Sequence, residues 1–482
     1  MTRFRKAVGR LFGAIPDWAF LLGVYVLALA PRLAFVLALG RSPLGVDEVE
    51  YDMIARSLVD GKGYAWYLGL ATAFRPPGYP FFLAGIYLLL GKSFYYARLV
   101  QAFIAAAHPL ATYAVCRPIF GRRAARLSAV FVALYVPLIL YSLGLLTENI
   151  FIPLVLLALW FTLRIPEKGL LRGAAPAAIL YGAAILVRPS LTFFMPLVVA
   201  WILLATRDWK RTVVSGAVMA AIVLAMVTPW SVRNYKVTGQ FVYLDTLTGY
   251  NLYIGYREDA DGSFDMDAAT EMAYMLRDKV LRKEAESDVI MHNWGKARAM
   301  EFIRAHPYRA LALVPLKIAH FWSLEHRMFI FAYSYNYIGE LSPLMLTLFF
   351  IVLLSPYAFL ALFAVVGAVF GRRKGPGLWL LLLLLGYYTA LHAAVFGEAR
   401  LHFPLVPVLA MLAAAGVFGL RRVRAGLRSR EPRVRTGGVR RLAIMCVCIL
   451  LLLTAWAHGI WYSWPQWKVI YSPGGNTAQL PY

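Results

Sequence analysis

Hydrophobic residues along this chain fall into long runs that are separated by short polar segments. A helix needs about 20 residues to cross a hydrocarbon layer about 30 Å thick, and most of the runs approach that length. The runs predict helices over residues 15–39, 94–117, 124–145, 149–164, 173–188, 191–205, 212–230, 344–370, 377–395, 401–420 and 442–462. The pattern therefore predicts an all-α polytopic membrane protein with about eleven transmembrane helices.

Two segments between these runs are too long to be simple connections. The first, 41–80, leads into a short apolar stretch, 81–90, which we expect to lie in the interface or re-enter rather than span. Consecutive prolines make residues 75–78 non-helical. The second segment mixes aromatic residues with helix-like charged stretches and predicts a small mixed extracytoplasmic domain. We therefore expect a transmembrane catalytic module with its outer loop, an extracytoplasmic domain, further transmembrane helices and an outer tail, over residues 1–230, 231–343, 344–462 and 463–482.

The charge distribution indicates the orientation of the chain. The formal net charge is +24, an excess that in a soluble protein would suggest nucleic-acid binding. Here 26 Arg and Lys residues, against three acids, fall in alternate loops, namely 3–10, 117–126, 164–172, 207–211, 372–374 and 421–441. Basic loops stay on the cytoplasmic side. We therefore expect no nucleic-acid partner, a cytoplasmic N-terminus and a multi-pass protein of the plasma (bacterial inner) membrane.

The three cysteines lie in or beside apolar runs, where thiols behave as small hydrophobic groups. We expect neither a disulfide nor a cysteine metal site. The candidates for chemistry are instead charged residues at the outer ends of the predicted helices.

The first candidates are the adjacent acids Asp47 and Glu48, just outside the first predicted helix, which cannot both face the same way. Asp47 could instead cap a short interfacial helix that begins at Glu48. The next are Arg75 and Tyr79 in the turn 74–80. Arg75 could bind a phosphate, or it could extend to lipid headgroups.

Further along the chain, Glu148 lies near the bilayer surface, where an ionisable group is expensive and often functional. Glu398 and Arg400 form a charged hairpin that could be only an interfacial salt bridge. Arg188 and Arg233 are also on the predicted outer side, where they could be simple anchors. Together these residues place more charged side chains on the outer side than the positive-inside rule predicts.

In this order, the motifs resemble the GT-C superfamily of polyprenyl-phosphate-sugar-dependent glycosyltransferases. They are similar to family 39, its protein-mannosyltransferase-like members, and the bacterial lipid A aminoarabinose and galacturonosyl transferases. The resemblance runs from Arg32 to about Val408. It rests on Asp47-Glu48, Arg75-Pro-Pro-Gly-Tyr-Pro80 with Arg98-Leu99, Leu146-Thr-Glu148, Arg233-Asn234 with Gly239, and Arg400 with Pro404 and Pro407.

The resemblance implies a GT-C fold and roles for particular residues. Asp47 would be the catalytic base, Arg75 would contact the lipid phosphate, and late arginines such as Arg400 would help to hold it. Some relatives carry a metal-binding acid where this chain has Phe74, so we expect no resident cofactor, with a divalent metal as the open alternative.

The chemistry that follows is an inverting transfer from a polyprenyl-phosphate-linked sugar to an acceptor hydroxyl on a lipid, glycan or protein. Asp47 would accept the hydroxyl proton, Arg75 and Arg400 would stabilise the leaving phosphate, and Glu48 and Glu148 would orient hydroxyl groups. A transporter or flippase of lipid-linked saccharides is the alternative, although transporters usually show midplane charges or repeats. A membrane scaffold is a third option, and it requires no cooperation among the charged residues.

Overall fold

The computed structural model describes residues 15–66, 69–265, 267–268, 270–271, 284–334, 336, 338–371, 375–427 and 432–480. This described part is built from helices and loops, with no strand beyond two isolated bridges. The prediction of an all-α polytopic membrane protein is confirmed. The basic segments 3–10 and 372–374, and residues 428–431 of the loop 421–441, lie outside the described residues.

Nine segments of the described chain are long and apolar enough to cross a membrane. Several consist of two consecutive helices. They are α2 (Asp17–Leu39), α5 with α6 (Phe94–Ala105 and His108–Phe120), α9 with α10 (Glu148–Gly169 and Ala175–Val187), η3 with α11 (Pro189–Phe194 and Met195–Thr206), α12 (Trp209–Thr238), α18 (Pro343–Phe370), α19 (Gly377–Ala394), η4 with α20 (Ala399–Leu405 and Val406–Leu427) and α21 (Pro432–Tyr462).

The difference between eleven predicted helices and nine spanning segments arises at two places. The 40-residue segment Glu148–Val187 folds back on itself at Gly169 and the π-helical turn Leu170–Ala174, so it contains two of the predicted helices. The predicted helix 124–145 is divided into α7 (Arg122–Ala133) and α8 (Val136–Tyr141). The break lies at Leu134 and Tyr135, because Pro137 has no N–H to donate to the carbonyl oxygen of Ala133 and its ring would clash with that carbonyl in a continuous helix.

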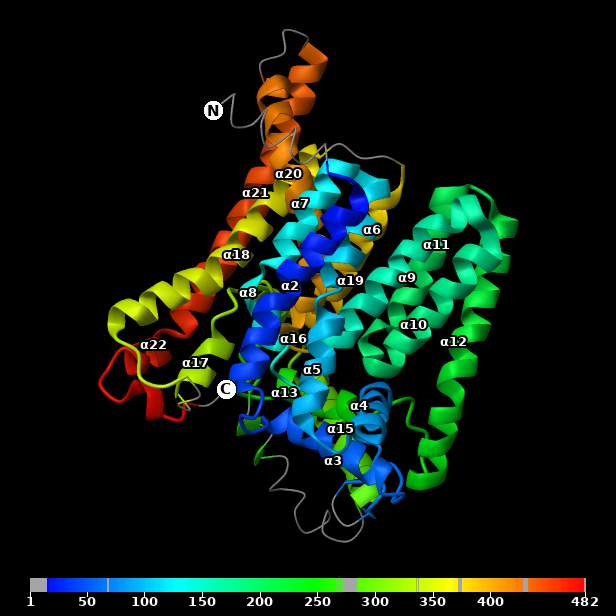
Figure 1. The fold of residues 1–482 in the computed structure, drawn as a ribbon, viewed down its shortest axis with the longest axis vertical. Helices are drawn as coiled ribbons and strands as arrows, with labels where there is room; N and C mark the ends of the chain where they lie inside the picture. Colours follow the sequence, from blue (N-terminus) through cyan, green and yellow to red (C-terminus); the bar gives the residue numbers. More distant parts are fainter. Residues whose placement is uncertain are drawn as a thin grey trace.

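Shorter helices gather at one end of this bundle. They are α3 (Val46–Val59), α4 (Gly78–Leu90), α13 (Leu247–Gly255) and α15 (Glu284–Ala305) (Figure 1). At the opposite end Arg117, Arg122 and Arg126 contact Asp17, the first residue of α2. The predicted basic loop 117–126 therefore lies at the same end as the start of the first spanning helix.

Several boundaries differ from the prediction. Helix α12 continues to Thr238, past the expected boundary at residue 230, and the helices α20 and α21 extend into the predicted basic loop 421–441. In the predicted mixed domain the described residues form helices and loops, including α16 (Pro307–Phe321) and α17 (Arg327–Ser334). A last short helix, α22 (Trp464–Ile470), lies in the tail.

Glycines allow close packing where α18 and α20 cross. A Cβ atom added to Gly367 would lie 1.8 Å from the Leu412 carbonyl oxygen, and one added to Gly416 would lie 2.2 Å from that of Phe363. Small residues of this kind let membrane helices approach each other closely. This contact holds α20, which continues directly from η4, the segment that carries Arg400.

Candidate active site

Helix α3 and the turn that precedes α4 are joined through Arg75. Asp47 and Glu50 are three residues apart on α3, so both carboxylates lie on the same helix face. The Arg75 Nη2 atom is 2.6 Å from Asp47 Oδ1, and its Nε atom donates to Glu50 Oε2 at 2.6 Å. The guanidinium carbon also lies 5.0 Å from the centre of the Tyr51 ring and 5.3 Å from that of Phe74. Arg75 is therefore held on several sides.

The local sequence explains why the turn takes this place. Residues 75–77 are non-helical, as the prolines predict, but Gly78, which was also predicted to be non-helical, is the first residue of α4. A Cβ atom at Gly78 would lie 2.8 Å from backbone atoms of Leu186 and Val187. Only glycine lets the turn pack this closely against the end of α10.

The interpretation of Asp47 as a helix cap is wrong. The N-cap of α3 is Gly45, the structure gives this end no side-chain cap, and Asp47 is the second residue of the helix. Its carboxylate is instead directed to the arginines. The two adjacent acids do face different partners, because Glu48 accepts a hydrogen bond from Arg98 at 2.9 Å.

Arg400 reaches the same carboxylate from the other half of the chain. Its Nη1 atom is 3.7 Å from Asp47 Oδ2, and its Nε atom donates to Glu398 Oε2 at 3.0 Å. The predicted pair of Glu398 and Arg400 is present. The Arg400 side chain is 28% exposed, whereas that of Arg75 is 12% exposed. Arg400 is therefore the more accessible of the two cations beside Asp47.

A buried polar network fixes the segment that carries Arg400. His402 Nε2 lies 2.7 Å from Glu325 Oε1, and His402 Nδ1 lies 2.6 Å from the carbonyl oxygen of Phe321. Tyr135 donates a hydrogen bond to the same Glu325 oxygen at 2.5 Å, and the Tyr357 ring stacks on His402 with centroids 4.5 Å apart. Such a buried network restricts η4 to one position.

A second ion pair lies close to the first group. Glu148, at the start of α9, pairs with Arg188, which directly follows α10. Arg188 also lies near enough to Asp47 to lower the pKa of that carboxyl. The structure thus brings together Asp47, Glu48, Arg75, Glu148, Arg188, Glu398 and Arg400 from the predicted set, and we call these residues with Glu50 and Arg98 the Asp47 cluster.

Two predicted site residues lie apart from this cluster or beneath it. Arg233 donates to the carbonyl oxygens of Thr72 and Tyr64, and its guanidinium carbon lies 4.9 Å from the centre of the Trp230 ring. These contacts pin the loop before Arg75 to α12. Tyr79 is fully buried and donates to Gln101 at 2.5 Å, so in this structure it supports the cluster from below.

The two carboxyl groups on Arg75 differ in acidity. Burial would raise the pKa of Asp47, but Arg75 and Arg400 outweigh it, and that pKa is lowered. For Glu50 burial is the stronger effect and raises the pKa, while Arg75 opposes it. Burial also raises the pKa of Asp245, in the loop after α12, to about 6. At neutral pH Asp47 is therefore firmly ionised and able to accept a proton only as charge develops.

The residues present do not fit a bound divalent metal. Such an ion needs several convergent oxygen or nitrogen ligands. In the described part of the chain no group of three or more His, Cys, Asp or Glu residues could hold one, and the carboxylates beside Asp47 are each engaged by an arginine. Phe74 is directed to Arg75. We therefore assign no step to a metal.

Sequence reasoning missed Glu50 as a site residue and gave Arg98 no role. Glu50 could have been found by placing a helix over residues 46–59, because a spacing of three residues puts it beside Asp47. The role of Arg98 could not be found from the spacing of residues along a helix. Its guanidinium donates to the carbonyl oxygens of Gly40 and Ser42 and to Glu48, contacts that depend on the packing of α5 against the loop after α2.

Comparisons with known proteins agree with this architecture. A family model described as dolichyl-phosphate-mannose-protein mannosyltransferase matches residues 74–232, about a third of the chain. The match covers Arg75, Glu148 and Arg188. No curated protein sequence matches the chain.

Three solved structures match the chain over nearly its whole length. The archaeal oligosaccharyltransferase AglB from Archaeoglobus fulgidus, in complex with an inhibitory peptide and a dolichol-phosphate, has a TM-score of 0.51 and 15% identity over 98% of this chain and 60% of that one. A structure of the Archaeoglobus fulgidus oligosaccharyltransferase tethered to an acceptor peptide has a TM-score of 0.50 and 13% identity, over 97% and 60%. ArnT from Cupriavidus metallidurans bound to undecaprenyl phosphate has a TM-score of 0.46 and 15% identity, over 98% and 76%.

The structural matches cover only part of the archaeal proteins. The chain spans about 60% of the length of the archaeal oligosaccharyltransferases. At 13–15% identity the likeness concerns the fold. The fold of the chain is thus similar to that of the archaeal oligosaccharyltransferase over 60% of that protein's length.

Proposed function

We propose that this chain, which its fold and family-model match assign to the GT-C superfamily of glycosyltransferases, moves a sugar from a polyprenyl-phosphate donor to an acceptor hydroxyl. The observation that carries the proposal is the meeting of Asp47, Arg75 and Arg400, which come from α3, from the turn before α4 and from η4. A base beside two cations is what displacement of a phosphate leaving group requires. The family description and the dolichol-phosphate in the AglB structure support the choice of donor.

In this proposal Asp47 accepts the proton of the acceptor hydroxyl while that oxygen attacks the anomeric carbon. The bond from the anomeric carbon to the phosphate oxygen breaks, and the leaving polyprenyl phosphate keeps the electron pair. A single displacement inverts the anomeric centre. Arg75 and Arg400 lower the pKa of Asp47. The carboxylate therefore accepts the proton only when charge has developed on the attacking oxygen.

Arg75 and Arg400 have different roles in this mechanism. Arg75, held by Asp47, Glu50 and the Tyr51 ring, orients the base. Arg400 is more exposed and lies farther from Asp47, so it can turn toward the phosphate as negative charge grows there. Glu48 and Glu148 remain our candidates for orienting hydroxyl groups, and Arg188 for the phosphate. The hydroxyl could belong to a lipid, a glycan or a protein.

We propose that the reaction takes place at the outer face of the plasma membrane, and the positive-inside pattern supports this side. The Asp47 cluster lies at the end of the bundle opposite the Asp17 contacts, whose arginines belong to a predicted cytoplasmic loop. A polyprenyl tail would stay in the lipid while its sugar phosphate reaches this end.

The test is the release of polyprenyl phosphate from a lipid-linked sugar by the purified protein. Asp47→Asn should reduce release by about 10³-fold and leave the folded protein intact, while Asp60→Asn, at the exposed end of α3, should behave as the wild type. Mass analysis of envelope glycolipids and glycans in a deletion strain would identify the acceptor. If lipid-linked sugars cross the membrane intact, with no glycosidic bond broken, the chain is a flippase and the proposal is wrong.

A further inference from the structure

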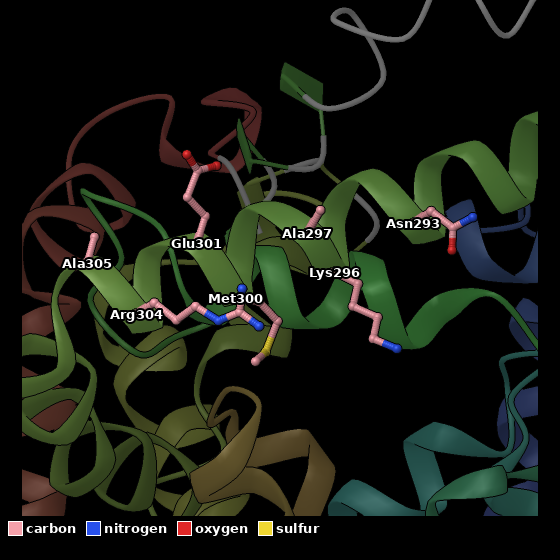
Figure 2. A pocket seen from close by; sticks show the side chains of 7 residues that line it. All are labelled: Asn293, Lys296, Ala297, Met300, Glu301, Arg304 and Ala305. Carbon is pink, nitrogen blue, oxygen red and sulfur yellow. The ribbon is translucent and has the colours of Figure 1, made fainter.

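One face of helix α15 packs against the rest of the protein, and the opposite face is exposed. Its packed face meets α13, where Gly295 approaches the backbone of Gly249 and the Trp294 ring lies 4.8 Å from that of Tyr253. Along the exposed face runs an open hollow of about 680 Å³. The hollow is lined by Asn293, Lys296, Ala297, Met300, Glu301, Arg304 and Ala305 (Figure 2).

The positively and the negatively charged side chains lie on different sides of this helix face. Figure 2 shows Lys296, Met300 and Arg304 directed to one side of the helix and Glu301 directed to the other. Glu301 accepts a hydrogen bond from Arg298 at 2.9 Å. Within the described chain no ion pair joins Lys296 or Arg304 to a carboxylate. The side of the hollow that carries these two residues is therefore positively charged, with a methionine between the charges.

One end of the hollow lies where a membrane-spanning helix ends. Asn293 donates a hydrogen bond to the side chain of Gln240 at 2.9 Å, and Gln240 is two residues beyond the last residue of α12, Thr238. The neighbouring Phe241 is 75% exposed. In the last turn of α12, Tyr235 is 57% exposed, and exposed tyrosines at the end of a spanning helix are typical of the lipid headgroup level.

At its other end α15 leads directly into a helix with an exposed apolar stripe. On α16 the exposed residues Tyr308, Leu311, Ala312 and Pro315 follow the spacing of one helix face. Tyr308 is 87% and Leu311 68% exposed. Such a stripe next to basic residues is what an interfacial helix presents to a bilayer.

We propose that α15 and α16 form a membrane-docking face whose Lys296 and Arg304 bind the phosphate of an anionic phospholipid. Met300, Tyr308 and Leu311 would contact the glycerol and upper acyl region of the same leaflet. The charge of the hollow and the exposed apolar stripe together favour a lipid over a soluble anion, which would need no apolar contact.

This lipid site is separate from the proposed reaction centre. Helix α13 lies against the opposite face of α15 and carries Tyr250, whose ring is 6.4 Å from that of Phe74, the neighbour of Arg75. The lipid would hold the α13 and α15 layer at a constant height over the membrane. Loss of the site would therefore weaken lipid binding without removing any residue of the Asp47 cluster.

The experiment measures phosphatidylglycerol and phosphatidylcholine binding to the purified full-length protein by native mass spectrometry. We compare the wild type with the Lys296→Gln/Arg304→Gln variant and with Arg298→Gln, an exposed arginine of the same helix outside the hollow. A basic residue near a membrane surface contributes about fivefold to the binding of an anionic lipid, so the double variant should bind phosphatidylglycerol about 25-fold more weakly. Phosphatidylcholine binding and the Arg298→Gln variant should be unchanged.

Three results would overturn the proposal. They are equal phosphatidylglycerol binding by the double variant and the wild type, an equal loss in Arg298→Gln, and displacement of phosphatidylglycerol by polyprenyl phosphate, which would assign the hollow to the donor. If the double variant does not fold, each single variant serves in its place, because Lys296 and Arg304 are both exposed. The binding measurement uses no sugar donor, so its outcome is independent of the proposed transfer.

Discussion

Two groups of ion pairs lie at opposite ends of the helix bundle. At one end a single acid, Asp17, contacts three arginines, and two of those arginines are about half exposed. At the other end the Asp47 cluster combines five acids and four arginines from separate segments of the chain. The first group joins neighbouring helices, while the second gathers charge around one carboxylate. The same residue types thus serve anchoring in one place and, we propose, chemistry in the other.

The comparison is tested most strongly by removing the central carboxylate of each group. Asp47→Asn should reduce sugar transfer by about 10³-fold, because the base is lost while the shape is kept. Asp17→Asn should leave the rate of transfer unchanged. The rates of polyprenyl phosphate release by the two purified variants check this expectation, and similar rates for both would contradict the difference we draw between the groups.

The next effect concerns stability within the Asp47 cluster. Glu148→Gln leaves Arg188 without its carboxylate partner in a largely buried place, and it should lower the free energy of unfolding by about 3 kcal/mol. Thermal unfolding in detergent measures the change. The exchanged pair Glu148→Arg/Arg188→Glu should recover part of it, and no recovery would show that the two charges do not act as a pair.

A smaller effect separates the two carboxylates that share Arg75. As pH falls, Glu50, with its raised pKa, takes up a proton before Asp47, whose pKa is lowered. Arg75 then interacts more strongly with Asp47 and makes it a weaker base. Glu50→Gln should therefore transfer about tenfold more slowly at neutral pH. In this variant only Asp47 still titrates. The fall of the rate with decreasing pH should therefore begin at a lower pH than in the wild type.

The pH profile of the rate, measured for the wild type and for Glu50→Gln, decides this point. An unchanged acid limb in the variant would remove Glu50 from the mechanism. Asp60→Asn again provides the matched control on α3.

The smallest expected effect belongs to the Asp17 group. Asp17→Asn removes the carboxylate charge beside the exposed Arg122 and the buried Arg126, but its amide oxygen can still accept the hydrogen bonds of both arginines. Because Arg126 keeps an acceptor, only the charge contribution is lost, and for a partly exposed carboxylate that is about 1 kcal/mol or less. The unfolding free energy of this variant should thus change by about 1 kcal/mol, and a loss as large as that of Glu148→Gln would make the two groups equivalent in stability.

Much of the architecture follows from the sequence alone. The lengths of the apolar runs predicted the spanning helices, because a helix that crosses lipid must satisfy its backbone internally over about 20 residues. The prolines at residues 76 and 77 predicted the non-helical turn that carries Arg75. The order of the charged motifs predicted a resemblance to the GT-C superfamily, and a mannosyltransferase family model matches residues 74–232 of the chain.

The partners of each charged residue were decided only by the tertiary structure. Periodicity says which residues share a helix face, but it does not say which distant segment lies opposite. The sequence could not show that Arg400 lies 3.7 Å from an Asp47 oxygen 353 positions earlier, or that Arg233 binds backbone carbonyls instead of joining the cluster. Those contacts arise from the packing of α20 against α18 and of α12 against the outer loop, and packing is a property of the whole folded chain.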